Sequence, residues 1–248
     1  MMEMNFILLL AIIVLWASVV HGAIGFGFGM ISTPLVALMA DIQTTIIFML
    51  LPTMAVNILS IVSEGNFFEA LKKFWFIILL MVLGSALGTV LLVYSNSEFF
   101  KLLLAAIIFL YLLQGFVKIE ATFVSKYPKS STYGLGVFGG IISGLTNVVA
   151  PLMIMYTLEM KYSRKDTIQL SNLCFLFTKI GQIAVFVFYG TFTLDTLGIS
   201  IFTVLVVCIG MFFGIKIKKR IDVKYYTKIL KGLLFIIASF LVINTVFN

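Results

Sequence analysis

A glycine-rich motif that ends in Pro-Leu occurs twice inside apolar sequence, and it limits how this chain can fold. The first copy runs from Gly22 to Leu35 and the second from Gly139 to Leu152. Pro34 and Pro151 therefore lie 117 residues apart in a chain of 248 residues. Glycine and proline interrupt helices, so the pattern predicts two broken helices at matched positions of two halves.

The composition is that of an all-α integral membrane protein. Hydrophobic residues make up 62% of the chain, charged residues make up 11%, and the mean hydropathy is +1.18. Soluble domains are about half apolar and about a quarter charged. All ten carboxylates fall at or beyond the edges of apolar segments, so the net charge of +7 lies in short loops. We interpret it as a determinant of orientation and lipid contact, not as a nucleic-acid surface.

The apolar runs set the number of membrane crossings. The first run, residues 5–40, has 36 residues and would extend ~54 Å as one helix, far more than the ~30 Å of a bilayer core. We expect it to break between His21 and Gly29. The remaining runs are 42–62, 74–94, 99–118, 133–158, 167–189, 197–217 and 226–246. The sequence predicts seven to eight transmembrane helices, with the motif segments broken or re-entrant.

Further similarities support a division into two pseudo-symmetric repeats. Gly84 and Gly88 are matched by Gly210 and Gly214, a small-residue spacing that lets membrane helices approach closely. We predict one transmembrane transport domain, 1–248. Its first repeat covers about 1–118, its second about 133–248, and a linker occupies 119–132.

Basic residues favour an inverted relation between the repeats. If residues 5–20 cross once and each motif segment dips in and returns, every Lys and Arg near a segment end except Lys101 lies on one side. Such a bias marks the cytoplasmic side. This arrangement has seven crossings, an inside N-terminus and an outside C-terminus. Eight simple crossings give a weaker bias and remain the alternative.

Lys179 is the strongest candidate for a substrate contact, because it lies near the middle of the run 167–189. A lysine at the centre of a membrane helix costs roughly 2.5 to 3.5 kcal/mol. No Asp or Glu lies at comparable depth, so an anionic substrate is the natural counter-charge. In the alternative interpretation, Lys179 snorkels to an interface.

Polar residues at helical spacing accompany this lysine. Asn172 and Gln182 are seven and three residues away, and Asn57 is the rough equivalent of Lys179 in the first repeat. For Asn57 and Gln182, a bond between helices is an equal alternative to substrate binding. The motifs add small residues, donors and half-helix N-termini, which attract anions. The motif residues predicted to bind substrate are Gly25, Gly27, Gly29, Ser32, Thr33, Gly144, Thr146 and Asn147.

His21 is the only histidine, and it precedes the first break. It titrates in the physiological range, which suits proton coupling, although a lone histidine is more often a hydrogen-bonded structural group. Cys174 and Cys208 lie in apolar runs and are predicted to act as small hydrophobes, without a disulfide or metal site.

At these residues the chain resembles the sulfite exporter TauE/SafE family. Gly25 to Gly29 with Pro34-Leu35 matches the family's first motif, and Gly139 through Gly144 to Pro151-Leu152 is similar to the second. The second copy departs at Asn147 and Ala150, where the family usually has glycine. The resemblance implies a multi-pass carrier of small sulfur-containing or carboxylate anions in the cell membrane.

These features together predict a secondary transporter for a small oxyanion such as sulfite, sulfoacetate or a related organosulfur or carboxylate anion. No cofactor is expected. The expected partners are the substrate and the lipid bilayer, and the protein is a monomer or homodimer. A passive anion channel and a non-transporting membrane assembly protein are the alternatives. An intramembrane enzyme is disfavoured, because the chain has one His, no His-Glu-x-x-His and no Gly-x-Ser-x-Gly.

Overall fold

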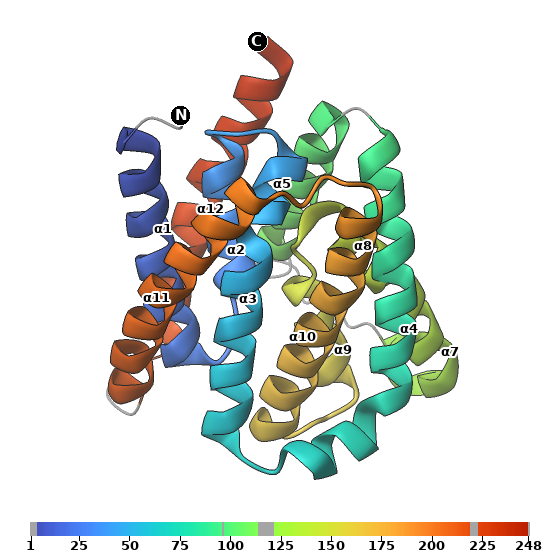
Figure 1. Ribbon diagram of the computed structural model, residues 1–248. Helices are drawn as coiled ribbons and strands as arrows, with labels where there is room; N and C mark the ends of the chain where they lie inside the picture. Colours follow the sequence, from blue (N-terminus) through green and yellow to red (C-terminus); the bar gives the residue numbers. More distant parts are fainter. Residues whose placement is uncertain (1–3, 96, 114–121, 219–222, 248) are drawn as a thin grey trace.

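The computed structural model describes residues 4–95, 97–113, 122–218 and 223–247, and these residues form helices without any strand (Figure 1). In chain order the helices are α1 (Met4–Ile24), α2 (Phe28–Ala37), α3 (Ile42–Glu64), α4 (Phe67–Tyr94), α5 (Ser97–Leu113), α6 (Thr122–Lys126), α7 (Pro128–Gly134), the π-helix η1 (Leu135–Gly139), α8 (Gly140–Thr146), α9 (Ala150–Glu159), α10 (Arg164–Phe188), α11 (Leu194–Ile217) and α12 (Val223–Phe247). The all-helical prediction is therefore confirmed for the described residues.

Five of the described helices are long and apolar enough to cross a membrane. They are α1, α3, α4, α10 and most of α11. Helices α2, α5 and α12 contain shorter apolar stretches of 10–17 residues. Part of the predicted linker, residues 122–132, forms α6 and the start of α7.

The long N-terminal apolar run breaks where the glycines predict. Helix α1 ends at Ile24, Gly25 and Gly27 adopt φ angles of 102° and 108°, and α2 begins at Phe28. Only glycine takes such angles without steric strain. Helix α2 then returns beside α1, so the two form a helical hairpin (Figure 1).

The second motif breaks its helix in a similar way. Helix α8 ends at Thr146, Asn147 takes a left-handed φ of 60°, and α9 begins at Ala150. Pro151 stands in the first turn of α9, where its missing N–H removes no helical hydrogen bond. Each motif thus forms two helix segments separated by a short non-helical stretch.

Two pairs of long helices run in opposite directions. In Figure 1 helix α3 runs downward and α10 upward, while α4 runs upward and α11 downward. Helix α1 packs along α11, and α4 packs along α8 and η1. Helices α3 and α10 contact each other, and each also contacts a long helix of the other half, α11 and α4 respectively.

The repeated glycine pairs form these close helix contacts. A Cβ atom on Gly84 or Gly88 would collide with a backbone oxygen of η1 or α8. A Cβ on Gly214 would collide with the Val19 oxygen and lie 2.9 Å from Gly22 Cα in α1. The predicted packing role of the pairs is therefore confirmed.

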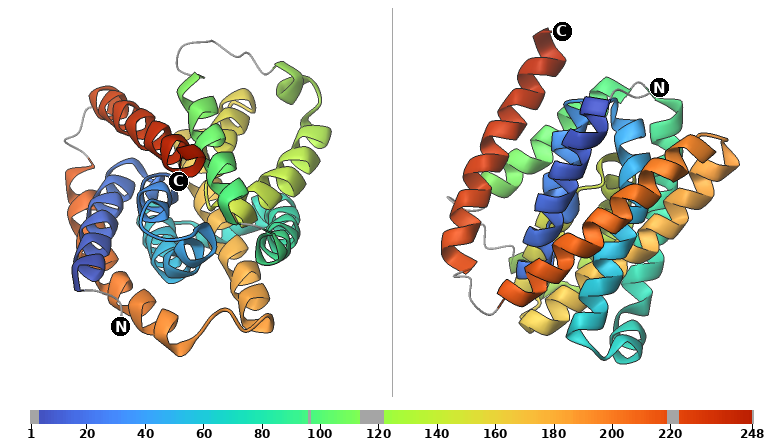
Figure 2. Two further views of the ribbon diagram at one scale, coloured as in Figure 1. Left: turned by 90° about the horizontal axis from the view of Figure 1, so that it is seen from above. Right: turned by 60° about the vertical axis from the view of Figure 1, so that its left-hand side comes forward.

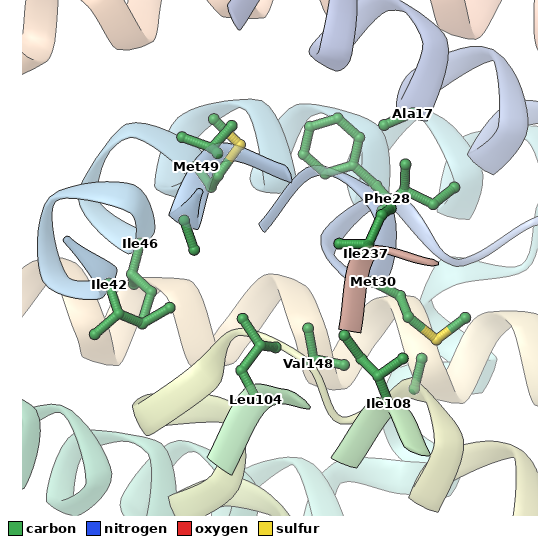
Figure 3. Close-up of a cluster of buried hydrophobic side chains, with 14 of the residues drawn as sticks. Ala17, Phe28, Met30, Ile42, Ile46, Met49, Leu104, Ile108, Val148 and Ile237 are labelled. Atoms are coloured by element: carbon green, nitrogen blue, oxygen red, sulfur yellow. The ribbon is translucent and has the colours of Figure 1, made fainter. Parts of the chain in front are cut away.

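Buried apolar side chains fill the space between the hairpin and its neighbours. Figure 3 shows this cluster, whose side chains come from α1, α2, α3, α5, α12 and the stretch before α9. The labelled members are Ala17, Phe28, Met30, Ile42, Ile46, Met49, Leu104, Ile108, Val148 and Ile237. Their close packing fixes both broken segments against the neighbouring helices.

Both ends of the chain lie at the same end of the helix bundle (Figures 1 and 2). This differs from the predicted seven-crossing path, in which the two ends lay on opposite sides. The reason is that the chain turns back after α1 through the shorter α2, and α3 begins at the end of the bundle where α1 begins, so the predicted first crossing and first dip form a single hairpin. At the opposite end of the bundle, Lys73 pairs with Asp166 at 2.8 Å and Lys218 pairs with Glu64.

Candidate functional site

The two helix breaks face each other inside the bundle. A Cβ on Gly29 would lie 2.8 Å from the backbone oxygen of Asn147, and Asn147 Nδ2 donates to Thr33 Oγ1 at 2.8 Å. Between the breaks lies a pocket of about 20 Å³, which holds roughly one water molecule. Its lining comprises His21, Gly27, Phe28, Gly29, Met30, Thr53, Asn57, Ser143, Asn147, Val148, Val149, Ala150, Phe175 and Lys179.

Two helix N-termini reach this pocket. The first turn of α2, from Gly27 to Met30, and the start of α9, from Val148 to Ala150, both line it. First-turn N–H groups have no acceptor within their own helix, and the helix dipole places partial positive charge there. Both motifs therefore present the kind of backbone surface that binds anions.

Lys179 adds an amine that carries a positive charge when it is protonated. Its side chain is 1% exposed and lines the pocket from α10. The ammonium Nζ donates to Gln182 Oε1, and Gln182 Nε2 donates to the Gly144 oxygen at 3.2 Å. Lys179 thus faces the interior of the bundle and does not snorkel. No Asp or Glu of the described chain lines the pocket, so a protonated Lys179 has no carboxylate beside it there.

Asn57 and Thr53 present unsatisfied polar groups to the same space. They lie one turn apart on α3, are 1% and 4% exposed, and line the pocket. Both polar atoms of the Asn57 amide and the Thr53 hydroxyl lack hydrogen-bond partners within the described part of the chain. Leaving a buried polar group unsatisfied costs about 1–3 kcal/mol. The Asn57 amide and the Thr53 hydroxyl can therefore form hydrogen bonds with a ligand that enters the pocket.

Sequence reasoning missed Thr53. Its only signal is its position four residues before Asn57 on the same helix face. The sequence does not mark Phe28, Met30, Phe175 and Val148 as pocket residues, because apolar residues occur throughout this chain.

His21 is held in a defined tautomer by its neighbours. The Phe28 N–H donates to Nδ1 at 3.3 Å, so the ring proton lies on Nε2. Nε2 lies 3.1 Å from Asn172 Oδ1 and 2.9 Å from Ser60 Oγ. The Asn172 amide nitrogen donates to the Gly25 and Ile168 oxygens, both at 2.7 Å, which fixes the amide orientation. Neutral His21 therefore ties the first break to α3 and α10.

The predicted residues divide into two groups. Gly27, Gly29, Asn57, Asn147, Lys179 and His21 line the pocket. Gly25, Ser32, Thr33, Gly144, Thr146, Asn172 and Gln182 lie outside its lining. Ser32 and Thr146 donate to the carbonyl oxygens of Phe28 and Ile142 in their own helices, both at 2.8 Å. Thr33, Gly144, Asn172 and Gln182 hold the lining residues or the breaks in place.

The fold and pocket define a polytopic membrane protein with a small buried pocket, which is lined by one lysine and by no carboxylate of the described residues. The model of the family described as sulfite exporter TauE/SafE matches residues 10–241. The chain therefore belongs to this family of membrane transporters, which implies a small-molecule substrate and a lipid bilayer. No curated protein and no solved structure gave a significant match.

Proposed function

We propose that the protein is a secondary transporter that moves a small oxyanion, such as sulfite, sulfoacetate or a related organosulfur or carboxylate anion, across the cell membrane. The observation that carries this proposal is the position of the Lys179 ammonium. It lies buried in a pocket without carboxylates, beside the unsatisfied Asn57 and Thr53 groups. An anion supplies the missing counter-charge and the missing hydrogen-bond partners at once.

The pocket groups have complementary roles in this proposal. Lys179 offsets the net charge of the anion. The Asn57 amide and the Thr53 hydroxyl donate to its oxygens, and the first turns of α2 and α9 donate backbone N–H groups. Gln182 and Asn172 act as positioning residues, since they bind the ammonium and the Gly25 oxygen.

The small volume of the pocket favours a carrier over an open channel. A cavity of about 20 Å³ holds roughly one water molecule, whereas sulfite has four non-hydrogen atoms. The two breaks must therefore move apart before the anion binds. Rocking of one half against the other around a central site provides that motion in transporters built from inverted repeats.

The antiparallel courses of α3 and α10, and of α4 and α11, support inverted repeats. The matched contacts of α1 with α11 and of α4 with α8 support the same relation. These observations support the predicted repeats, about 1–118 and 133–248. Both repeats belong to one proposed transport domain, 1–248.

The basic residues support an orientation in the cell membrane that differs from the predicted one. Lys72, Lys73, Lys161, Arg164 and Lys165 flank the α3–α4 and α9–α10 turns, which lie at the end of the bundle opposite the chain ends. By the positive-inside rule this end is cytoplasmic. We therefore place the N-terminus outside, in place of the inside position expected from sequence.

The hydrogen bond between His21 and the start of α2 provides a way to couple transport to protonation of His21. A second proton on Nδ1 would break its bond with the Phe28 N–H at the start of α2. Protonation would thereby loosen the helix end that lines the pocket.

Counterflow in proteoliposomes tests the transport proposal. Vesicles preloaded with unlabelled sulfite should accumulate labelled sulfite, and unlabelled anion on the far side should accelerate uptake, as for a carrier. Lys179→Met should abolish this flux. The matched control is Lys231→Met in α12, where the lysine Nζ lies 5.5 Å from the centre of the Tyr111 ring. Flux at the wild-type level in Lys179→Met would contradict the proposed role of Lys179, and flux without trans-acceleration would contradict the carrier proposal.

A further inference from the structure

A second cavity lies next to the polar pocket, between the first break, α9 and the start of α10. Its volume is about 300 Å³, at the lower end of the range for small-ligand sites. Its polar lining residues are Thr157, Tyr162, Arg164 and Thr167, and Ile24, Phe26 and Ile168 line it beside the first break. Arg164 is exposed and is the first residue of α10. The cavity therefore lies at the basic end of the bundle and carries a positive charge.

The wall between this cavity and the polar pocket is a single stretch of backbone. Ile24 and Phe26 line the cavity, whereas Gly27 and Phe28 line the pocket. Gly25 lies between them against Ile168, since a Cβ on Gly25 would lie 2.8 Å from Ile168 Cδ1. The wall thus consists of one chain segment with two positive-φ glycines and one isoleucine side chain.

Hydrogen bonds connect this wall to the site. Asn172 Nδ2 donates to the oxygens of both Gly25 and Ile168, and Asn172 Oδ1 accepts from His21, which lines the pocket. A movement of His21 in the pocket would therefore shift the Asn172 amide and, with it, the Gly25–Ile168 contact.

We propose that the 300 Å³ cavity is the cytoplasmic access vestibule for the substrate anion, with Arg164 as its first binding group and the Gly25–Ile168 contact as its gate. This inference rests on the proposed transport function. The observations that support it are the charge of Arg164 and the single stretch of backbone, Ile24 to Phe28, whose residues line both the cavity and the pocket. An anionic lipid headgroup offers the same chemistry to Arg164, so the experiment must separate the two sources.

Cysteine accessibility tests the vestibule without a transport assay. In a Cys174→Ala, Cys208→Ser background, Thr167→Cys places a thiol on α10 in the cavity wall. A membrane-impermeant, anionic methanethiosulfonate should modify it in inside-out vesicles and not in right-side-out vesicles. Ile180→Cys is the matched control, because Ile180 lies on the same helix, is 49% exposed and is absent from both linings. It should stay unmodified from both sides.

Arg164 and the gate have separate tests in the same vesicles. Arg164→Gln should slow modification of Thr167→Cys by the anionic reagent by about tenfold, and leave the rate of a neutral reagent unchanged. In Thr53→Cys the thiol lies in the polar pocket, and it should react slowly from the inside, only while the two breaks are apart. Adding Ile168→Ala should make this reaction faster, and an unchanged rate would contradict the gate.

Three results would overturn the vestibule. The first is modification of Thr167→Cys from the outside or from neither side. The second is protection of this thiol by anionic lipid in liposomes that is absent in purely zwitterionic liposomes, which would assign the cavity to a headgroup. The third is a Thr53→Cys thiol whose reaction rate is unchanged in Ile168→Ala. Failure of the transport proposal alone would show as the absence of anion counterflow in the wild-type protein with the accessibility pattern unchanged.

Discussion

The two halves of the molecule build the same break with different residues. In the first half, Gly25 and Gly27 on either side of Phe26 both adopt positive φ at the bend. In the second half, one residue takes the left-handed angle, Asn147, and its side chain donates to Thr33 Oγ1 in the first half. The first break therefore depends on backbone freedom, and the second break is held by a hydrogen bond across the interface between the halves.

The long helices differ in a related way. Asn57 of α3 is neutral and lacks partners among the described residues, whereas Lys179 of α10 carries charge and is bound by Gln182. Both side chains line the pocket. The two halves therefore line the pocket with side chains of different chemistry, an amide from α3 and an amine from α10.

The largest effect is expected at Gly25. Gly25→Ala combines backbone strain of about 1–2 kcal/mol with overpacking against Ile168 of about 1–3 kcal/mol. In Gly27→Ala the strain is similar, but no heavy atom lies within 4 Å of the new Cβ. Thermal unfolding in detergent should thus show a larger loss for Gly25→Ala. Equal losses would mean that the Ile168 contact has no energetic role.

Asn147 should respond differently to two substitutions. Asn147→Gly keeps the left-handed angle and loses only the bond to Thr33, which costs about 0.5–1.5 kcal/mol. Asn147→Val also places a β-branched side chain at positive φ, where it is an outlier. A double-mutant cycle with Thr33→Val measures the bond itself. A coupling energy near zero would remove the proposed link between the halves.

Asn57→Leu should separate stability from function. Replacing an unsatisfied buried amide by an apolar side chain of similar shape is neutral or stabilising, by about 1 kcal/mol, since the cost of the unpaired groups disappears. Transport should nevertheless fall strongly. A destabilised protein, or one with full flux, would show that the amide serves packing.

The smallest effect is expected at the basic end of the bundle. Lys73 and Asp166 form a salt bridge with side chains 50% and 32% exposed, and such pairs contribute about 0–1 kcal/mol. Asp166→Asn should therefore change the unfolding temperature little, and high salt should remove the difference. A large fall in the unfolding temperature would show that this salt bridge stabilises the packing of α4 against α10.

The sequence predicts the breaks well, because glycine and proline act locally. Gly25 and Gly27 mark the first bend, and the membrane class follows from composition. The donors Ser32 and Thr146 are less predictable, since a hydroxyl in a helix commonly binds a carbonyl of its own helix, and the sequence does not reveal which way it points. Thr53 was missed for the same reason.

The orientation of the N-terminus also lay beyond the sequence argument. The first 71 residues contain no Lys or Arg, so the distribution of basic residues cannot place α1. Only the path of α2 beside α1 shows that the first hairpin begins and ends at one end of the bundle.

Anion binding to the purified protein is the most direct test of the central claim that the polar pocket holds a small oxyanion beside Lys179. The unfolding temperature should rise in a saturable way with sulfite or sulfoacetate, because a ligand that binds only the folded state stabilises it. The rise should persist in Lys231→Met and vanish in Lys179→Met. An equal rise in Lys179→Met would show that the anion binds elsewhere and would contradict the account.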